Sequence, residues 1–180
     1  STLTLLAGTG SLTFSSAVGG TTPLAALTHN VGSTPKINGG LLRTVGTQTY
    51  NGSVITDVAT TLRTANGDVS AIGKFDANIG AIFTLDLGTG AAPFSNPANG
   101  FNIINITSAG TVSLVEASTM DLGTVNVGTL IARPVAGNIQ LNGNITASGS
   151  GNSIVLVTGS NWASSFSNFG NYTLNPGAGS

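Results

Sequence analysis

The residues best suited to chemistry in this sequence are six carboxylates. They are Asp57, Asp68, Asp76, Asp86, Glu116 and Asp121. Carboxylates that share one face can act as a general acid and base, or can bind calcium. Only Asp68, Asp76 and Asp86 lie within about one repeat of each other, and Asp68 follows Asn66-Gly67 as turn residues commonly do. We therefore interpret them as isolated turn residues, with an acid site on one face as the alternative.

Nucleophilic catalysis has little support. A hydrolytic triad needs a base, and the single histidine, His29, stands beside Asn30 in a turn-like setting with no nucleophile-elbow pattern in the chain. We expect His29 to be a solvent-facing corner residue. The sequence has no cysteine, which excludes disulfides and thiolate chemistry, and it has no calcium-binding GGxGxD repeat. The sequence predicts no enzyme, no cofactor and no metal site.

Charge is unusually sparse. Only 6% of the residues are charged, the formal net charge is −1, and the five basic residues are scattered along the chain. Such a chain has no basic stripe that could collect phosphates, so nucleic acid is not an expected partner. No apolar run approaches the roughly 18 residues that a transmembrane helix needs. We expect no transmembrane segment.

The elements that would position these residues are short strands. Ser, Thr, Asn and Gly supply the surface polarity, Thr suits a pleated strand with one face in water, and helix formers at amphipathic spacing are nearly absent. With 26 Gly and 40% hydrophobic residues, the chain is rich in turns and still large enough to bury a core. This composition predicts an all-β protein.

A degenerate repeat organises the strands. Residues 3–5 (LTL) and 12–14 (LTF) flank a Gly-Thr-Gly turn, and similar units recur around Leu62 and around Ile106, where Ala109-Gly110 is the predicted turn. Such a unit cannot bury its apolar face alone, so copies must stack and share a continuous core. We therefore predict a β-solenoid, with stacked Asn side chains in its corners.

Several finer expectations follow from the same pattern. Strands are predicted at residues 24–28, 36–38, 82–87 and 154–157, and a rapid succession of short strands at 101–143. The inward side chains are expected to be Val54, Leu62, Val69 and Ile72. We expect residues 74–100, which carry a cluster of Phe residues, to form the widest turn, an excursion that covers part of the core.

Six phrases carry a resemblance to a known family. They are AVGGTTPLAAL (17–27), INGG (37–40), GTQTYNGSV (46–54), TTLRTANGDVSAIG (60–73), GNSIVLVTGSNW (151–162) and LNPGAG (174–179). In this order they resemble the degenerate repeats of filamentous-haemagglutinin-type exoproteins. The resemblance implies a right-handed parallel β-helix, secreted by a Gram-negative bacterium and displayed on its outer surface as an adhesive or structural fibre. The expected partners are host or neighbouring cell surfaces, including their glycans.

On this basis we expect residues 1–180 to form a single solenoid domain, a fragment or processed piece of a longer exoprotein. Residues 158–180 are expected to be a cap or a contact tail, because an open last turn would offer unpaired backbone groups to other chains. The aromatic residues of this tail are candidates for self-association: Trp162, Phe166, Phe169 and Tyr172.

Two surface motifs remain. Asn-x-Ser/Thr sequons occur at Asn51, Asn105, Asn144 and Asn171; most are expected from composition, although the resemblance allows glycosylation. The Thr-x-Thr pairs at 2/4 and 47/49 suggest ice binding as a further function. That function would require threonines aligned on one flat face in every repeat.

These observations favour a surface rod that attaches through many weak contacts. A subunit of a self-assembling extracellular filament is the alternative from the aromatic tail. A polysaccharide-active β-helix enzyme is a third alternative, and it predicts that three acids converge on one exposed face.

Overall fold

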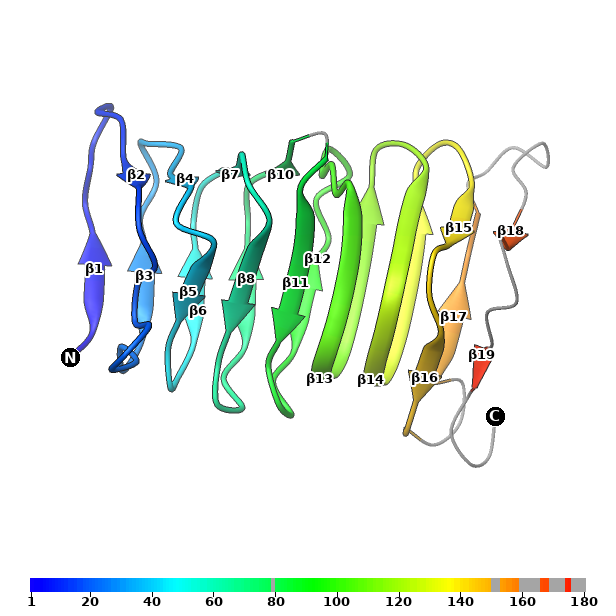
Figure 1. The fold of residues 1–180 in the computed structure, drawn as a ribbon. Helices are drawn as coiled ribbons and strands as arrows, with labels where there is room; N and C mark the ends of the chain where they lie inside the picture. Colours follow the sequence, from blue (N-terminus) through cyan, green and yellow to red (C-terminus); the bar gives the residue numbers. More distant parts are fainter. Residues whose placement is uncertain (79, 150–152, 159–165, 169–173, 176–180) are drawn as a thin grey trace.

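The protein is a right-handed parallel β-solenoid of about 7 turns, without helices among the described residues. The computed structural model describes residues 1–78, 80–149, 153–158, 166–168 and 174–175, with only the backbone described in the last two ranges. Figure 1 shows the turns stacked along one axis from the N-terminal to the C-terminal end. The predicted fold class is confirmed.

The second, third and fourth turns each contribute one strand to each of three parallel sheets, and the first turn contributes to the first two. The first sheet contains β1 (Leu3–Leu5), β3 (Leu27–His29), β6 (Gln48–Tyr50) and β9 (Val69–Ala71). The second contains β2 (Thr13–Phe14), β4 (Lys36–Ile37), β7 (Val54–Thr56) and β10 (Phe75–Ala77). Because Leu27, Gln48 and Val69 are register partners, successive turns here are 21 residues long.

The third sheet runs along most of the coil (Figure 1). It begins with β5 (Leu41–Arg43), β8 (Thr60–Arg63) and β11 (Ile82–Asp86) and continues with β12 (Ala92–Phe94), β13 (Ile103–Glu116) and β14 (Met120–Pro134). Its last members are β15 (Ile139–Leu141), β16 (Ile145–Ala147), β17 (Ile154–Leu156), β18 (Phe166–Asn168) and β19 (Leu174–Asn175). β18 pairs with β15 and β19 with β16, so part of the predicted tail continues the coil.

The strands predicted in 101–143 are fewer and longer than expected. The single strand β13 pairs with both β11 and β12. It therefore continues through a corner at which the previous turn has a break between two strands. The expected turn at Ala109-Gly110 is instead an irregularity in the register of β13 and β14. A Cβ at residue 110 would overlap the Thr89 carbonyl oxygen of the turn below, so glycine permits this close passage.

The core is a column of inward side chains, since alternate residues of every strand point to the axis. Val54, Leu62 and Val69 are fully buried, as predicted. The prediction for Ile72 is wrong: its side chain is 72% exposed. Val69 and Ala71 point inward, so the two-residue period places position 72 outside.

The prediction of a wide excursion at residues 74–100 is also wrong. This segment carries β10, β11 and β12, and its aromatic rings lie inside the coil. Phe75 contacts Phe83, Phe94 and Phe101, with ring centroids 4.6, 5.4 and 6.1 Å away. These four rings form an aromatic cluster within the hydrophobic core rather than a cover over it.

Candidate functional site

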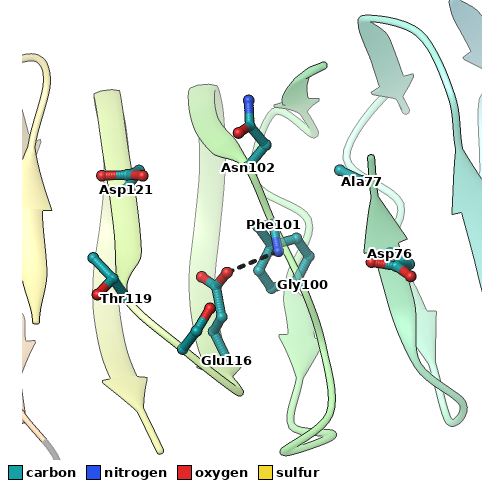
Figure 2. Close-up of a pocket in the computed structure, with 9 residues that line it drawn as sticks. Asp76, Ala77, Gly100, Phe101, Asn102, Glu116, Thr119 and Asp121 are labelled. Atoms are coloured by element: carbon teal, nitrogen blue, oxygen red, sulfur yellow. Dashed lines mark hydrogen bonds between the residues drawn. The ribbon is translucent and has the colours of Figure 1, made fainter. Parts of the chain in front are cut away.

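A groove opens where the second sheet ends. β10 is the last strand of that sheet; its Asp76 forms an isolated bridge with Gly100, and the chain then enters β13 in the third sheet. The groove has a volume of about 240 Å³. It is lined by Asp76, Ala77, Gly100, Phe101, Asn102, Glu116, Ser118, Thr119 and Asp121 (Figure 2). Three of the six carboxylates therefore meet in one place.

Glu116 lies at the inner wall of this groove. It is the last residue of β13, and its inward direction follows from Val112 and Leu114, which alternate with it and are fully buried. The side chain is only 2% exposed. Its Oε1 accepts a hydrogen bond from the Phe101 backbone N–H at 3.0 Å (Figure 2), whereas Oε2 has no hydrogen-bond partner among the described residues.

Burial controls the protonation of Glu116. Loss of solvent raises the pKa of this carboxyl from 4.5 to about 9; the Phe101 N–H opposes the change, and the nearby charge of Asp121 adds to it. The side chain is therefore neutral at pH 7. A neutral carboxyl has one O–H, so Glu116 can donate from the oxygen that has no partner.

The other two carboxylates have different surroundings. Asp121, near the start of β14, is half-buried, and burial raises its pKa although Asn142 Nδ2 donates to its Oδ1 at 3.3 Å. Asp76, on β10, forms an ion pair with Lys74 at 2.7 Å. In Figure 2, Glu116 lies between Asp121 on one side and Asp76 on the other. The groove thus combines one buried neutral acid with two more exposed carboxylates.

The carboxylates that lie close in sequence do not converge. Asp76 lines the groove, but Asp86 pairs with Arg63 at 3.0 Å on the third sheet, and Asp68 accepts a hydrogen bond from the Ala91 N–H. Asp57 pairs with Lys36 at 3.4 Å. The interpretation of Asp68 as a turn residue agrees with its place after Asn66, which has a positive φ of 71°. The other two carboxylates of the groove, Glu116 and Asp121, lie 40 and 45 residues after Asp76 in the sequence.

The expectation for His29 is wrong. It is fully buried at the end of β3, where it is the register partner of Tyr50. Its Nε2 lies 3.2 Å from Ser33 Oγ, Nδ1 has no partner among the described residues, and burial lowers its pKa. The alternation with Leu27, which also points inward, explains this position.

A second buried polar group lies one turn further on. Gln48 donates from Nε2 to the backbone carbonyls of Leu42 and Arg63, both at 3.0 Å, and its Oε1 accepts from the Tyr50 hydroxyl at 3.0 Å. Both residues are fully buried. Every polar atom of the two side chains is satisfied, so this cluster holds adjacent turns together and has nothing left to offer a ligand.

The candidate surface residues have mixed placements. Trp162, Phe169 and Tyr172 lie outside the described residues; Phe166 begins β18, of which only the backbone is described. Among the sequons, Asn144 is exposed and Asn171 is not described, while Asn51 and Asn105 are half-buried and hydrogen-bonded. Self-association and glycosylation stay predictions.

The longest row of hydroxyl groups lies on the first sheet, and elsewhere only pairs such as Thr61 and Thr84 are register partners in the described part of the chain. Thr4, Thr28, Thr49 and Ser70 are register partners on the outer face of the first sheet. The row ends at Pro93, the next outward residue, on β12. Ranked threonines do not recur in every turn, so the condition set for ice binding is not met. Asparagines do bond between turns as expected, for example Asn51 Nδ2 to Asn30 Oδ1 at 3.3 Å.

Sequence reasoning did not group Glu116 and Asp121 with any other acid. The buried position of Glu116 is indicated by residues 112–116 (VSLVE). There the acid alternates with Val112 and Leu114, so all three side chains point to the same side of the strand. The partners of Glu116 could not be found this way, because the bend after Gly100 brings them together. Within the described ranges, no set of three His, Cys, Asp or Glu residues is arranged to hold a metal ion.

Comparison of the chain with protein-family models, curated proteins and solved structures finds no match. In the described part of the chain no helix has the length and hydrophobicity to cross a membrane.

Proposed function

We propose that this chain is a rigid rod segment of a filamentous-haemagglutinin-type exoprotein, displayed on the outer surface of a Gram-negative bacterium. Its role is attachment to host or neighbouring cell surfaces through many weak contacts. The resemblance of the six repeat phrases supports the family, and the parallel stack supports the shape. In this proposal the protein is not an enzyme.

The observation that carries the adhesive role is the outer face of the first sheet. Adjacent strands of a sheet are about 4.8 Å apart, so the hydroxyls of Thr4, Thr28, Thr49 and Ser70 repeat at that spacing along the rod. Three ion pairs meanwhile join basic side chains to carboxylates of the same rod. A repeating neutral hydroxyl row suits weak contacts that gain strength through avidity.

The test compares valency. Beads coated densely with the chain are expected to adhere to epithelial cells or to glycan-coated surfaces, and the soluble chain is expected to inhibit them only at much higher concentration. A T28V/T49V variant removes two central hydroxyls and keeps the β-branched shape, so its beads should adhere less. A matched variant, T61V, changes an outward threonine of β8 on another face. Coated beads that adhere no better than albumin-coated beads would refute the adhesive role.

The edge of β1 supports a second candidate, a subunit that stacks end to end into a filament. β1 pairs with β3 alone among the described strands. Leu3 and Leu5 direct their backbone groups to β3, which leaves the backbone of Thr4 facing the open edge. Such an edge is a template for another strand.

This candidate has its own experiment. Filaments seen by electron microscopy, lengthening with protein concentration, would support stacking. T4P removes an edge N–H without removing a hydrogen bond inside the coil, so it should shorten the filaments, while T4V should not. Single short rods at every concentration would exclude end-to-end stacking of this chain and leave the adhesive proposal standing.

A further inference from the structure

The groove beside β10 contains one carboxyl oxygen that the fold leaves unpaired. Glu116 is almost completely buried, its Oε1 is held by the Phe101 N–H, and its Oε2 has no partner among the described residues. The close-up shows this second oxygen on the side of the groove that carries Thr119 and Asp121. A buried polar atom without a partner destabilises the folded protein, so a ligand that forms a hydrogen bond with it is favoured.

The charges around the groove favour a cation. The titratable groups that face Glu116 are Asp76 from β10 and Asp121 from β14. Lys74 balances Asp76 through their ion pair, whereas Asp121 forms no ion pair within the described residues. Asp121 therefore carries the unbalanced negative charge beside the unpaired oxygen of Glu116. A hydrogen-bond donor that carries positive charge would pair with Asp121 and, once Glu116 has released its proton, with Glu116 as well.

We propose that this groove binds a small primary ammonium ion, whose N–H groups donate to Glu116 Oε2 and to the carboxylate of Asp121. An ammonium carries three donors and no acceptor, which suits the carboxyl oxygens of Glu116 and Asp121 in a lining that also holds the hydroxyls of Ser118 and Thr119. A metal ion fits less well, because the described residues hold no three-ligand cluster. This site is separate from the surface contacts proposed above, and either proposal can fail without the other.

Binding in this form is coupled to a proton. Glu116 is neutral at pH 7 in the free protein, and a neighbouring cation stabilises its ionised form. The Glu116 proton then leaves to solvent as the ammonium enters. The structure therefore predicts the release of up to one proton per ligand at pH 7, and much less at pH 10, where Glu116 is mostly ionised.

The probe is methylammonium, added to the folded 180-residue chain with ¹³C-labelled glutamate. The sequence has a single glutamate, so its Cδ resonance reports Glu116 alone. At pH 7 the resonance is expected to move to the ionised position as methylammonium is added. Titration calorimetry in two buffers of different ionisation enthalpy should show the proton release. Tetramethylammonium, which has charge but no N–H, and glucose, which has hydroxyls but no charge, should produce neither effect.

Two variants test the assigned residues. E116Q keeps the side-chain shape and should abolish proton release and weaken binding about tenfold or more, the size of one charge-assisted hydrogen bond. D121N should weaken binding by a similar factor and keep some proton release, which preserves the test if E116Q alters the fold. D68N removes a carboxylate outside the groove and should bind as the parent does. The proposal is overturned if methylammonium leaves the Cδ resonance unchanged, or if tetramethylammonium or glucose shifts it equally.

Discussion

The interior of the solenoid is polar in the turns of β3 and β6 and aromatic in the turns of β10 to β12. In the polar region, Gln48 and Tyr50 exchange a hydrogen bond and Gln48 reaches two backbone carbonyls. In the aromatic region, Phe75 and Phe83 pack at 4.6 Å without polar partners. The two regions meet directly, since Tyr50 lies edge-on to Phe75 at 6.4 Å.

The difference shows that the interior of one solenoid can be packed in two ways, by hydrogen-bonded polar side chains or by aromatic rings. Hydrogen bonds at Gln48 depend on direction and fix the positions of particular carbonyls, whereas ring contacts tolerate small shifts and contribute through buried area. Glu116 joins the far side of the aromatic region through the Phe101 N–H, yet only one of its oxygens is satisfied. A fully bonded polar group thus stabilises the stack, and a half-bonded one marks a site.

The largest expected effect is the loss of the central ring. F75A removes a fully buried side chain that contacts Tyr50 and three other rings, so the free energy of unfolding should fall by about 3–5 kcal/mol. Urea unfolding followed by circular dichroism would measure it. F14A, at a half-buried position in the first turn, should cost clearly less. Equal losses would mean that the aromatic region is not the main hydrophobic support.

Q48L should be the most costly change in the polar region. Leucine fills similar space, but the Leu42 and Arg63 carbonyls each lose the Gln48 donor and the Tyr50 hydroxyl loses its acceptor, so we expect a loss of about 3 kcal/mol. Q140L makes the same substitution on the half-buried outer position of β15, and should change stability by about 0.5 kcal/mol or less. If both variants unfold at the same urea concentration, the buried hydrogen bonds contribute little.

E116Q should stabilise the protein, by an amount that depends on pH. Because the pKa of Glu116 rises from 4.5 to about 9 on folding, the folded protein binds more protons than the unfolded chain between these values. Stability from this group is therefore complete below pH 4.5 and is lost as pH rises to about 9. At pH 7 the loss is about 3 kcal/mol, which glutamine avoids because it does not ionise.

The measurement for E116Q is urea unfolding at pH 5, 7 and 9. The gain over the parent should be small at pH 5 and increase with pH. D68N, which removes an exposed carboxylate, should follow the parent at all three values. A gain that is independent of pH would show that Glu116 does not carry a proton in the folded state.

Much of the fold was predictable because apolar and polar residues alternate along strands that have one face in the core. Leu62 and Val69 were placed inside from alternation, and Asn66-Gly67 marked a turn that the positive φ of Asn66 confirms. The strand ends of β13 were not predictable, because its corner is made by close passage of Gly110 over Thr89 and not by a turn motif. Phe75 was misplaced since a dense run of Phe, Pro and Asn resembles a loop.

The candidate site was less accessible to sequence reasoning. The inward position of Glu116 could be read from residues 112–116, but its nearness to Asp76 depends on how many residues each turn takes. Turns are 21 residues long at Leu27 and 18 between Val112 and Leu130. Small differences of this kind decide which outward side chains line up, and a degenerate repeat does not specify them.

The smallest expected effect is that of Y50F, because Tyr50 lies where the polar and aromatic regions meet. Y50F keeps the ring that packs on Phe75 and removes only the hydroxyl that donates to Gln48 Oε1, so it should cost about 1 kcal/mol. In the Q48L background the same change should cost less, because the hydroxyl already lacks its acceptor, and a double-mutant cycle by urea unfolding measures that coupling. Additive effects would mean that Tyr50 supports the stack through its ring alone, and would extend the aromatic region one turn toward the N-terminus.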